Sequence, residues 1–219
     1  MPSPRRSVIV AVLVLLAGLG FAGCGRAQPG VAFYIGDTRY TEKQIDEIVD
    51  EIAAAVPGVD VGDLRDNAVN GLVIRDLGQR AAREKSVDVP APDYAATSQR
   101  LRLPENARLT RLLAESTTVA GALVDVAGPV QVTDKDLRDI YEVLLESAGD
   151  QQLKPFEEVA QQLRADAFLP KILGVRNLLV AQAEKVGVEV NPRYLPLTAA
   201  LGEVPVPLTD GIGVVVDEF

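Results

Sequence analysis

The feature that most constrains the fold is a series of apolar stripes that repeat at helical spacing between prolines and glycines. Residues at i, i+3, i+4 and i+7 share one face of an α-helix, so each stripe predicts an amphipathic helix. Thr41 and Gln44 have the spacing of a capping box before the first stripe, and Pro170 predicts a kink or break before the last. The stripes occupy residues 41–56, 62–85, 93–103, 109–127, 133–148, 155–163 and 172–186. We therefore expect a mainly α fold with six to seven amphipathic helices.

Two short segments near the ends of the helical region have the composition of strands. Val31–Ile35 precedes the turn Gly36-Asp37, and Val188–Val190 alternates apolar and acidic residues. We expect these segments to pair, which predicts a minor two-stranded sheet near the two ends of one domain, residues 31–190. Residues 191–219 form a proline-rich tail without helical period, which we expect to be loosely attached, with Val214–Val216 as a candidate late strand.

The N-terminus has the three parts of an export signal. Arg5 and Arg6 are followed by an apolar stretch, Val8–Gly23, and by small residues at its end. As a helix, this stretch would reach about 24 Å, short of the roughly 30 Å hydrocarbon core of a bilayer, so a cleaved signal is favoured over a membrane-spanning helix. Phe21-Ala22-Gly23-Cys24 resembles the bacterial lipobox, although Phe21 stands where leucine is usual.

The lipobox resemblance implies that residues 1–23 are a signal peptide and that Cys24 becomes the acylated first residue of the mature chain. Residues 24–30 would then be a flexible tether, and the expected location is the outer, extracytoplasmic face of the cell membrane. Two or three acyl chains hold a protein firmly, whereas one gives only marginal binding. Plain secretion and an uncleaved anchor are the alternatives.

The charge of the chain argues against several partners. The signal holds two of the 22 basic residues and none of the 31 acidic ones, so its removal changes the formal net charge from −9 to about −11. Nucleic acid is therefore not an expected partner. Anionic lipid headgroups would also repel the body, so membrane attachment must come from acyl chains on Cys24.

The residues that are missing exclude many kinds of site. The chain has no histidine, so it cannot form a Ser-His-Asp or Cys-His nucleophilic site, and it lacks the commonest metal ligand. Tryptophan is absent as well, which leaves few stacking platforms for sugars. Cys24 is the only cysteine, so no disulfide is possible within one chain. We expect no catalytic residues, no metal and no cofactor, and we do not expect an enzyme.

Several short motifs follow one another in a recognisable order. They are the strand and turn at residues 31–37, the Thr41-capped helix, Arg83-Glu-Lys-Ser-Val-Asp-Val89, Val132-Thr-Asp-Lys-Asp-Leu137 with Tyr141, Pro155-Phe-Glu-Glu-Val159, and Val188-Glu-Val-Asn-Pro-Arg-Tyr194. This order, from Ala32 to Tyr194, resembles the SurA-like foldase group. Members of that family are extracytoplasmic chaperones whose helical body grips unfolded exported chains, and many add a parvulin-type prolyl isomerase domain.

The resemblance implies a chaperone module without the isomerase. The family's isomerase domain sits between the helices that here carry Tyr141 and Pro155, but the interval from Ser147 to Lys154 is only a loop. The parvulin site also uses histidines, which this chain lacks. The implied function is holdase binding of unfolded or exported polypeptides. The long region 104–129 and the tail after Tyr194 depart from the family, which leaves room for a specialised partner.

A holdase needs apolar surface that a client can reach. The short helix bounded by Pro92 and Pro104 is the least able to bury a whole face, which makes it and its surroundings the candidate contact region. The candidate client-contact residues are Tyr94, Leu101, Leu103, Leu109 and Leu112. The alternative is that these residues complete the core. The alternative function is a structural or adaptor lipoprotein that binds one specific envelope protein.

Overall fold

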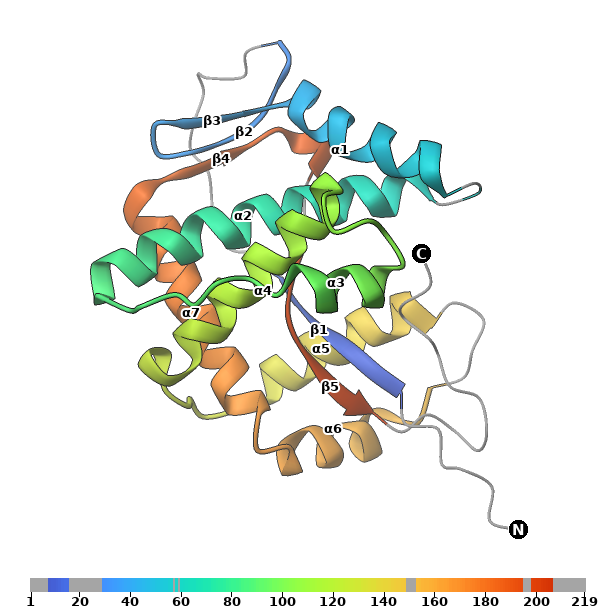
Figure 1. Cartoon of the computed structure of the whole chain (residues 1–219). Coiled ribbons are helices and arrows are strands. Elements are labelled where there is room, and N and C mark those ends of the chain that lie inside the picture. Colours follow the sequence, from blue (N-terminus) through green and yellow to red (C-terminus); the bar gives the residue numbers. More distant parts are fainter. Residues whose placement is uncertain are drawn as a thin grey trace.

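The computed structural model describes residues 8–15, 29–56, 58, 60–148, 153–194 and 198–206, and it confirms a mainly helical fold with a small antiparallel sheet (Figure 1). The helices of this part are α1 (Glu42–Ala55), α2 (Val61–Lys85), α3 (Tyr94–Leu101), α4 (Arg108–Ala127), α5 (Asp134–Ala148), α6 (Phe156–Ala165) and α7 (Leu169–Val186). The strands are β1 (Val8–Leu15), β2 (Val31–Ile35), β3 (Thr38–Thr41), β4 (Val188–Val190) and β5 (Thr198–Val206), and η1 (Pro192–Tyr194) is a short 3-10 helix.

Local side chains set several of the helix starts. At α1 the Thr41 hydroxyl accepts from the Gln44 N–H (3.2 Å), and the Gln44 side chain accepts from the Thr41 N–H (2.7 Å), which is the predicted capping box. The expected break near Pro170 is also present, since α6 ends at Ala165 and Pro170 lies in the first turn of α7. Between them the Asp166 carboxylate accepts from the N–H of Leu169 at 2.9 Å.

The predicted pairing of Val31–Ile35 with Val188–Val190 is present, in a sheet of three strands rather than two. The strand order is β3-β2-β4, and Phe33 pairs with Val190 in antiparallel register. Beyond the ladder, the N–H of Gly36 donates to Gly187 (2.7 Å) and the N–H of Asn191 donates to Ala32 (2.8 Å). The sheet therefore ties the two ends of the helical region together, as expected.

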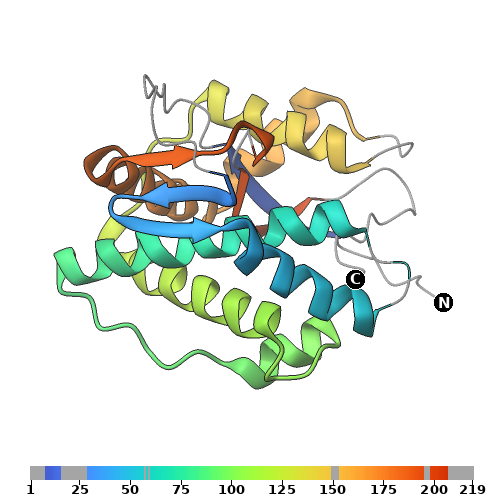
Figure 2. The ribbon, with the colours of Figure 1, turned by 90° about the horizontal axis from the view of Figure 1, so that it is seen from above.

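The core has two clusters that meet at α7. The larger cluster joins the sheet, α1, α2, α3, α4 and the second half of α7, and its fully buried members include Phe33, Ile45, Leu77 and Leu123. The smaller cluster joins α5, α6 and the first turns of α7 around Leu137. Figure 2 shows α5 and α6 set apart from the layer formed by α2 and α4. Because α7 contributes to both clusters, it is the element that holds them together.

Glycines allow α2 and α4 to pack closely. A Cβ at Gly71 would lie 2.9 Å from the side chain of Leu112, and one at Gly78 would lie 2.8 Å from that of Val119. These two glycines are seven residues apart, so they lie on the same face of α2. The α4 side chains thus occupy the space that larger residues on α2 would need.

A second, separate pair of strands comes from the two ends of the described chain. β1 and β5 pair antiparallel, from Val8 opposite Val206 to Leu15 opposite Thr198. Part of the predicted proline-rich tail, Thr198–Val206, thus forms a strand, in keeping with the expected lack of a helical period. Pro205 is compatible with this strand because both strands of a two-stranded ribbon are edge strands. The candidate strand Val214–Val216 lies outside the described residues.

Candidate functional site

The predicted lipid-attachment residue, Cys24, and most of the predicted tether lie outside the described residues. The described part resumes at Pro29 and Gly30. The Gly30 carbonyl accepts a hydrogen bond from the N–H of Glu42 at 3.0 Å, next to the first strand of the sheet. The last residue of the predicted tether is thus joined to the first residue of α1.

The structure places the four candidate leucines in the core, which was the alternative to client contact. Leu101, Leu103, Leu109 and Leu112 are each no more than 5% exposed and belong to the larger cluster. Large apolar side chains that are exposed in the described residues lie at other positions. They are Val61, Val126, Leu145 and Phe168.

Local geometry explains why the short helix α3 buries its leucines. The Asp93 carboxylate caps its start by accepting from the N–H of Ala96 (2.8 Å), and Arg102 ends it in the left-handed conformation (φ 54°). The turn that follows brings Leu103 back, so that its N–H donates to Ser98 (3.2 Å) and its carbonyl accepts from the Ser98 hydroxyl (2.6 Å). This closed turn directs Leu103 into the larger cluster of the core.

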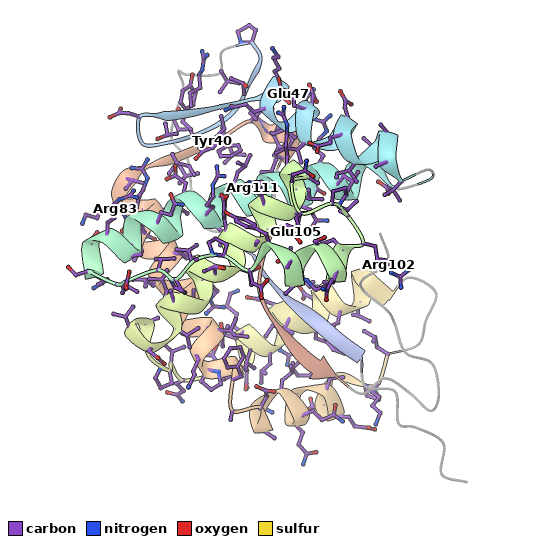
Figure 3. The ribbon with its side chains drawn as sticks, viewed as in Figure 1. Tyr40, Glu47, Arg83, Arg102, Glu105 and Arg111 are labelled. Atoms are coloured by element: carbon purple, nitrogen blue, oxygen red, sulfur yellow. The ribbon has the colours of Figure 1, made fainter. Side chains whose placement is uncertain are left out.

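Tyr94, the fifth candidate, is half-buried and held by two residues of α4. Its hydroxyl donates to Glu115 at 3.3 Å, and the Arg111 guanidinium stacks over its ring at 4.5 Å from the ring centre. Arg111 is one of the exposed cations labelled in Figure 3. Glu115 also pairs with Arg75 of α2 (3.1 Å), so Tyr94 is part of a polar network across three helices. Both the ring and the hydroxyl of Tyr94 are therefore occupied by contacts within the chain.

The ribbon of β1 and β5 lies between the two helical layers. β5 contacts α2, α4, α6 and α7, and β1 contacts α5. Figure 2 shows the ribbon between α5 and α6 on one side and the layer of α2 and α4 on the other. The helical body thus holds extended chain between its two parts. The sequence signal for β5 is weak because Gly202 and Pro205 interrupt a short apolar segment.

A polar cluster lies where the chain leaves the sheet and passes α1 and α2. The Tyr194 hydroxyl donates to Glu42, and Arg193 pairs with the other oxygen of that carboxylate (3.0 Å). Arg65 of α2 bridges Asp46 (2.6 Å) and the Tyr194 hydroxyl (3.4 Å). Burial and the bond to Glu42 raise the pKa of Tyr194 above its ordinary value. These residues line an open pocket of about 460 Å³.

The charges around this pocket are satisfied by one another. Glu42 accepts a hydrogen bond from the Tyr194 hydroxyl and forms an ion pair with Arg193. Arg65 forms an ion pair with Asp46 and donates a hydrogen bond to the Tyr194 hydroxyl. The arrangement fastens η1 to α1 and α2, and we assign it a structural role. Within the described residues, no group of three His, Cys, Asp or Glu side chains is placed to hold a metal ion.

A second network fastens the sheet to α2. The Tyr40 hydroxyl donates to Asp76 at 2.7 Å, and Arg80 pairs with the same carboxylate while donating to the Ile35 carbonyl (3.2 Å). Figure 3 shows Tyr40 between the strands and α2. Burial, together with Asp76, raises the pKa of Tyr40 to about 12. The phenol is thus held neutral over a wide range of pH.

Comparison with known proteins adds no family to these observations. No protein-family model, curated protein or solved structure matches the chain. Among the helices of the described part, none combines the length and apolar character needed to cross a bilayer.

Proposed function

We propose that the mature chain is a lipid-anchored protein of the extracytoplasmic membrane face, a SurA-like module that binds unfolded segments of exported polypeptides as a holdase without prolyl isomerase activity. The observation that carries the proposal is the ribbon of β1 and β5 between the two helical layers. A body that accommodates extended chain between its helices has the geometry that holding a non-native polypeptide requires.

The sequence supports the location. Arg5 and Arg6, the apolar stretch after them and Cys24 have the order of a lipoprotein signal. The seven residues from Cys24 to Gly30 reach about 25 Å when fully extended. A body joined to acyl chains through so short a tether would stay close to the membrane, where exported chains emerge.

The charge supports a role in keeping other chains soluble. Removal of residues 1–23 gives a net charge of about −11, because the segment holds two basic residues and no acidic residue. Acidic side chains such as Asp50 and Glu51 of α1 face solvent. Net charge of one sign opposes association between loaded molecules.

Acylation is tested by the intact mass of the membrane fraction. The wild-type chain should have the mass of residues 24–219 plus acyl chains, whereas Cys24→Ala should lose the acyl mass and remain uncleaved. Masses without acyl chains in both, differing only by the Cys24→Ala substitution itself, would overturn the anchor.

The holdase activity is tested with a reduced, unfolded client whose aggregation is followed by light scattering. The mature chain should suppress scattering at stoichiometric amounts, and a folded acidic protein of similar size serves as the control. Equal scattering with the mature chain and with the control would contradict the proposal.

A pull-down from membrane extracts separates the holdase from an adaptor lipoprotein. A broad set of exported proteins in substoichiometric amounts is expected of a holdase. One stoichiometric envelope protein would favour the adaptor instead.

A further inference from the structure

The two strands of the ribbon differ in what happens to them when the signal is removed. β1 is Val8–Leu15, inside the predicted signal peptide, and β5 is Thr198–Val206, inside the mature chain. The two are hydrogen-bonded neighbours in a sheet of their own. If the chain is processed before Cys24, as the proposed function holds, β5 keeps its place among the helices and loses its partner.

We infer that the mature chain binds an extended, apolar segment of an exported polypeptide as a strand added to β5, in the place that Val8–Leu15 takes in the unprocessed chain. The inference rests on the proposed function for the removal of residues 1–23.

The need for a partner follows from the backbone of β5. A strand edge presents a row of N–H and C=O groups, and such groups are costly when they are left unpaired away from water. β5 contacts α2, α4, α6 and α7, so helices of both core clusters lie against it. A new strand from another chain would restore the ladder that β1 supplies, which is the strand-addition mode of peptide binding.

The chemistry of the segment follows from the strand that fits there. β1 reads Val-Ile-Val-Ala-Val-Leu-Val-Leu, eight apolar residues without charge, and it lies against α5. Branched apolar residues favour extended backbone. The expected client segment is therefore about eight residues long, apolar and uncharged, a composition that exported chains expose while they are unfolded.

The register limits where the new strand is held most firmly. Regular pairing from Leu13 opposite Ala200 to Leu15 opposite Thr198 is separated by a bulge from the pairing of Val8–Ala11 with residues 203–206, and at the bulge β5 has one more residue than β1. Pro205, opposite Ile9, has no N–H to donate. Binding thus depends on a limited set of hydrogen bonds, and these alternate along the added strand.

This alternation gives a sharp test with labelled peptides. The probe is a fluorescein-labelled peptide with the sequence of residues 8–15 between two lysines at each end, and binding to the mature chain is followed by anisotropy. Two further peptides are N-methylated at alternate residues, one at positions 8, 10, 12 and 14 and the other at positions 9, 11, 13 and 15. They match in composition and apolar area, but only one of them loses the N–H groups that face β5.

The expected result is that the parent peptide and one methylated peptide bind, while the other methylated peptide binds about tenfold or more weakly. The unprocessed Cys24→Ala chain, in the same buffer, should bind the parent peptide about tenfold or more weakly than the mature chain, because its own β1 fills the place. Equal binding of both methylated peptides, no binding of the parent peptide, or equal binding by the two chains would overturn strand addition at β5.

Failure of this inference is distinguishable from failure of the proposed function. Suppression of client aggregation without any difference between the methylated peptides leaves the holdase in place and overturns strand addition. A clear difference between the peptides in a chain that neither carries acyl mass nor suppresses aggregation supports the β5 site and overturns the holdase.

Discussion

Asp136 of α5 and Arg176 of α7 form an ion pair, with 2.6 Å between Oδ1 and Nη1, in which the two side chains are only 9% and 19% exposed. The other carboxylate oxygen accepts from the N–H (2.9 Å) and the hydroxyl (2.5 Å) of Thr133. One carboxylate therefore caps α5 and joins it to α7, the helix shared by both clusters of the core.

Replacement of Asp136 by asparagine should lower the free energy of unfolding by about 3 kcal/mol, because Arg176 is left largely buried without its countercharge. Urea denaturation monitored by circular dichroism measures the loss. The matched control is Asp139→Asn on the same helix, whose partner Lys135 is 82% exposed, and it should change stability by less than about 0.5 kcal/mol. Equal losses in the two variants would show that the ion pair contributes nothing beyond a surface pair.

The ion pair between Asp136 and Arg176 also predicts that the folding stability falls at acid pH. Burial raises the pKa of Asp136, but the hydrogen bonds from Thr133 and Arg176 outweigh burial and hold the pKa below its ordinary value. The stabilisation is therefore complete above about pH 4 and is lost as the pH falls through the lowered pKa. The stability difference between wild type and Asp136→Asn, measured by urea denaturation at pH 6 and pH 3, should shrink at pH 3. A constant difference would contradict this assignment.

The raised pKa of Tyr40 predicts a loss of folding stability at alkaline pH. Its pKa rises from an ordinary value of 10 to about 12 in the folded chain, so its contribution is complete below pH 10 and is lost as the pH rises toward 12. Tyr40→Phe should lose about 1 kcal/mol at pH 8 with the bond to Asp76, and less at pH 11. Urea denaturation at both pH values measures this, with Tyr34→Phe on β2 as control. The prediction fails if Tyr40→Phe and wild type lose stability in parallel above pH 10.

The helices could be predicted because the information that specifies them is local. The apolar face of each helix repeats every three or four residues, and Thr41 with Gln44 lies within one turn of the helix that it caps. The spacing of Thr133 and Asp136 likewise predicts a cap for α5. Nothing local indicates that Arg176, forty residues further along, completes the environment of Asp136.

The candidate client-contact residues show what the apolar pattern of a sequence does not specify. A stripe identifies the face of a helix that is buried, but it does not identify what covers that face. The spacing of Leu101 and Leu109 is compatible with a client surface and with the core, and the structure buries both residues where α3 packs on α4. β5 could not be predicted either, because its pairing with Val8–Leu15 joins the two ends of the chain and its Pro205 is atypical of strands.

Thr110 of α4 is fully buried, and its hydroxyl has no hydrogen-bond partner within the described residues. Removal of an unpaired buried hydroxyl eliminates a desolvation penalty, so Thr110→Val should leave stability unchanged or raise it by about 1 kcal/mol. Thr97→Val is the matched control, because the Thr97 hydroxyl donates to the Asp93 carbonyl at 3.0 Å, and it should lose about 1 kcal/mol. Thermal unfolding of both variants decides this. A loss at Thr110 as large as that at Thr97 would indicate an unrecognised partner for its hydroxyl.

Gly174 of α7 lies against the turn that ends α4. A Cβ at this position would overlap the carbonyl oxygen of Gly128, which is backbone and cannot move aside as a side chain does. Gly174→Ala should therefore destabilise the chain by about 3 kcal/mol and separate α7 from α4. Gly121 of α4 has open space where its Cβ would be, so Gly121→Ala should instead stabilise the chain by about 0.5–1 kcal/mol through helix propensity. Opposite signs in urea denaturation are the expected outcome, and a stabilised Gly174→Ala would mean that α4 and α7 do not approach as closely as the structure has them.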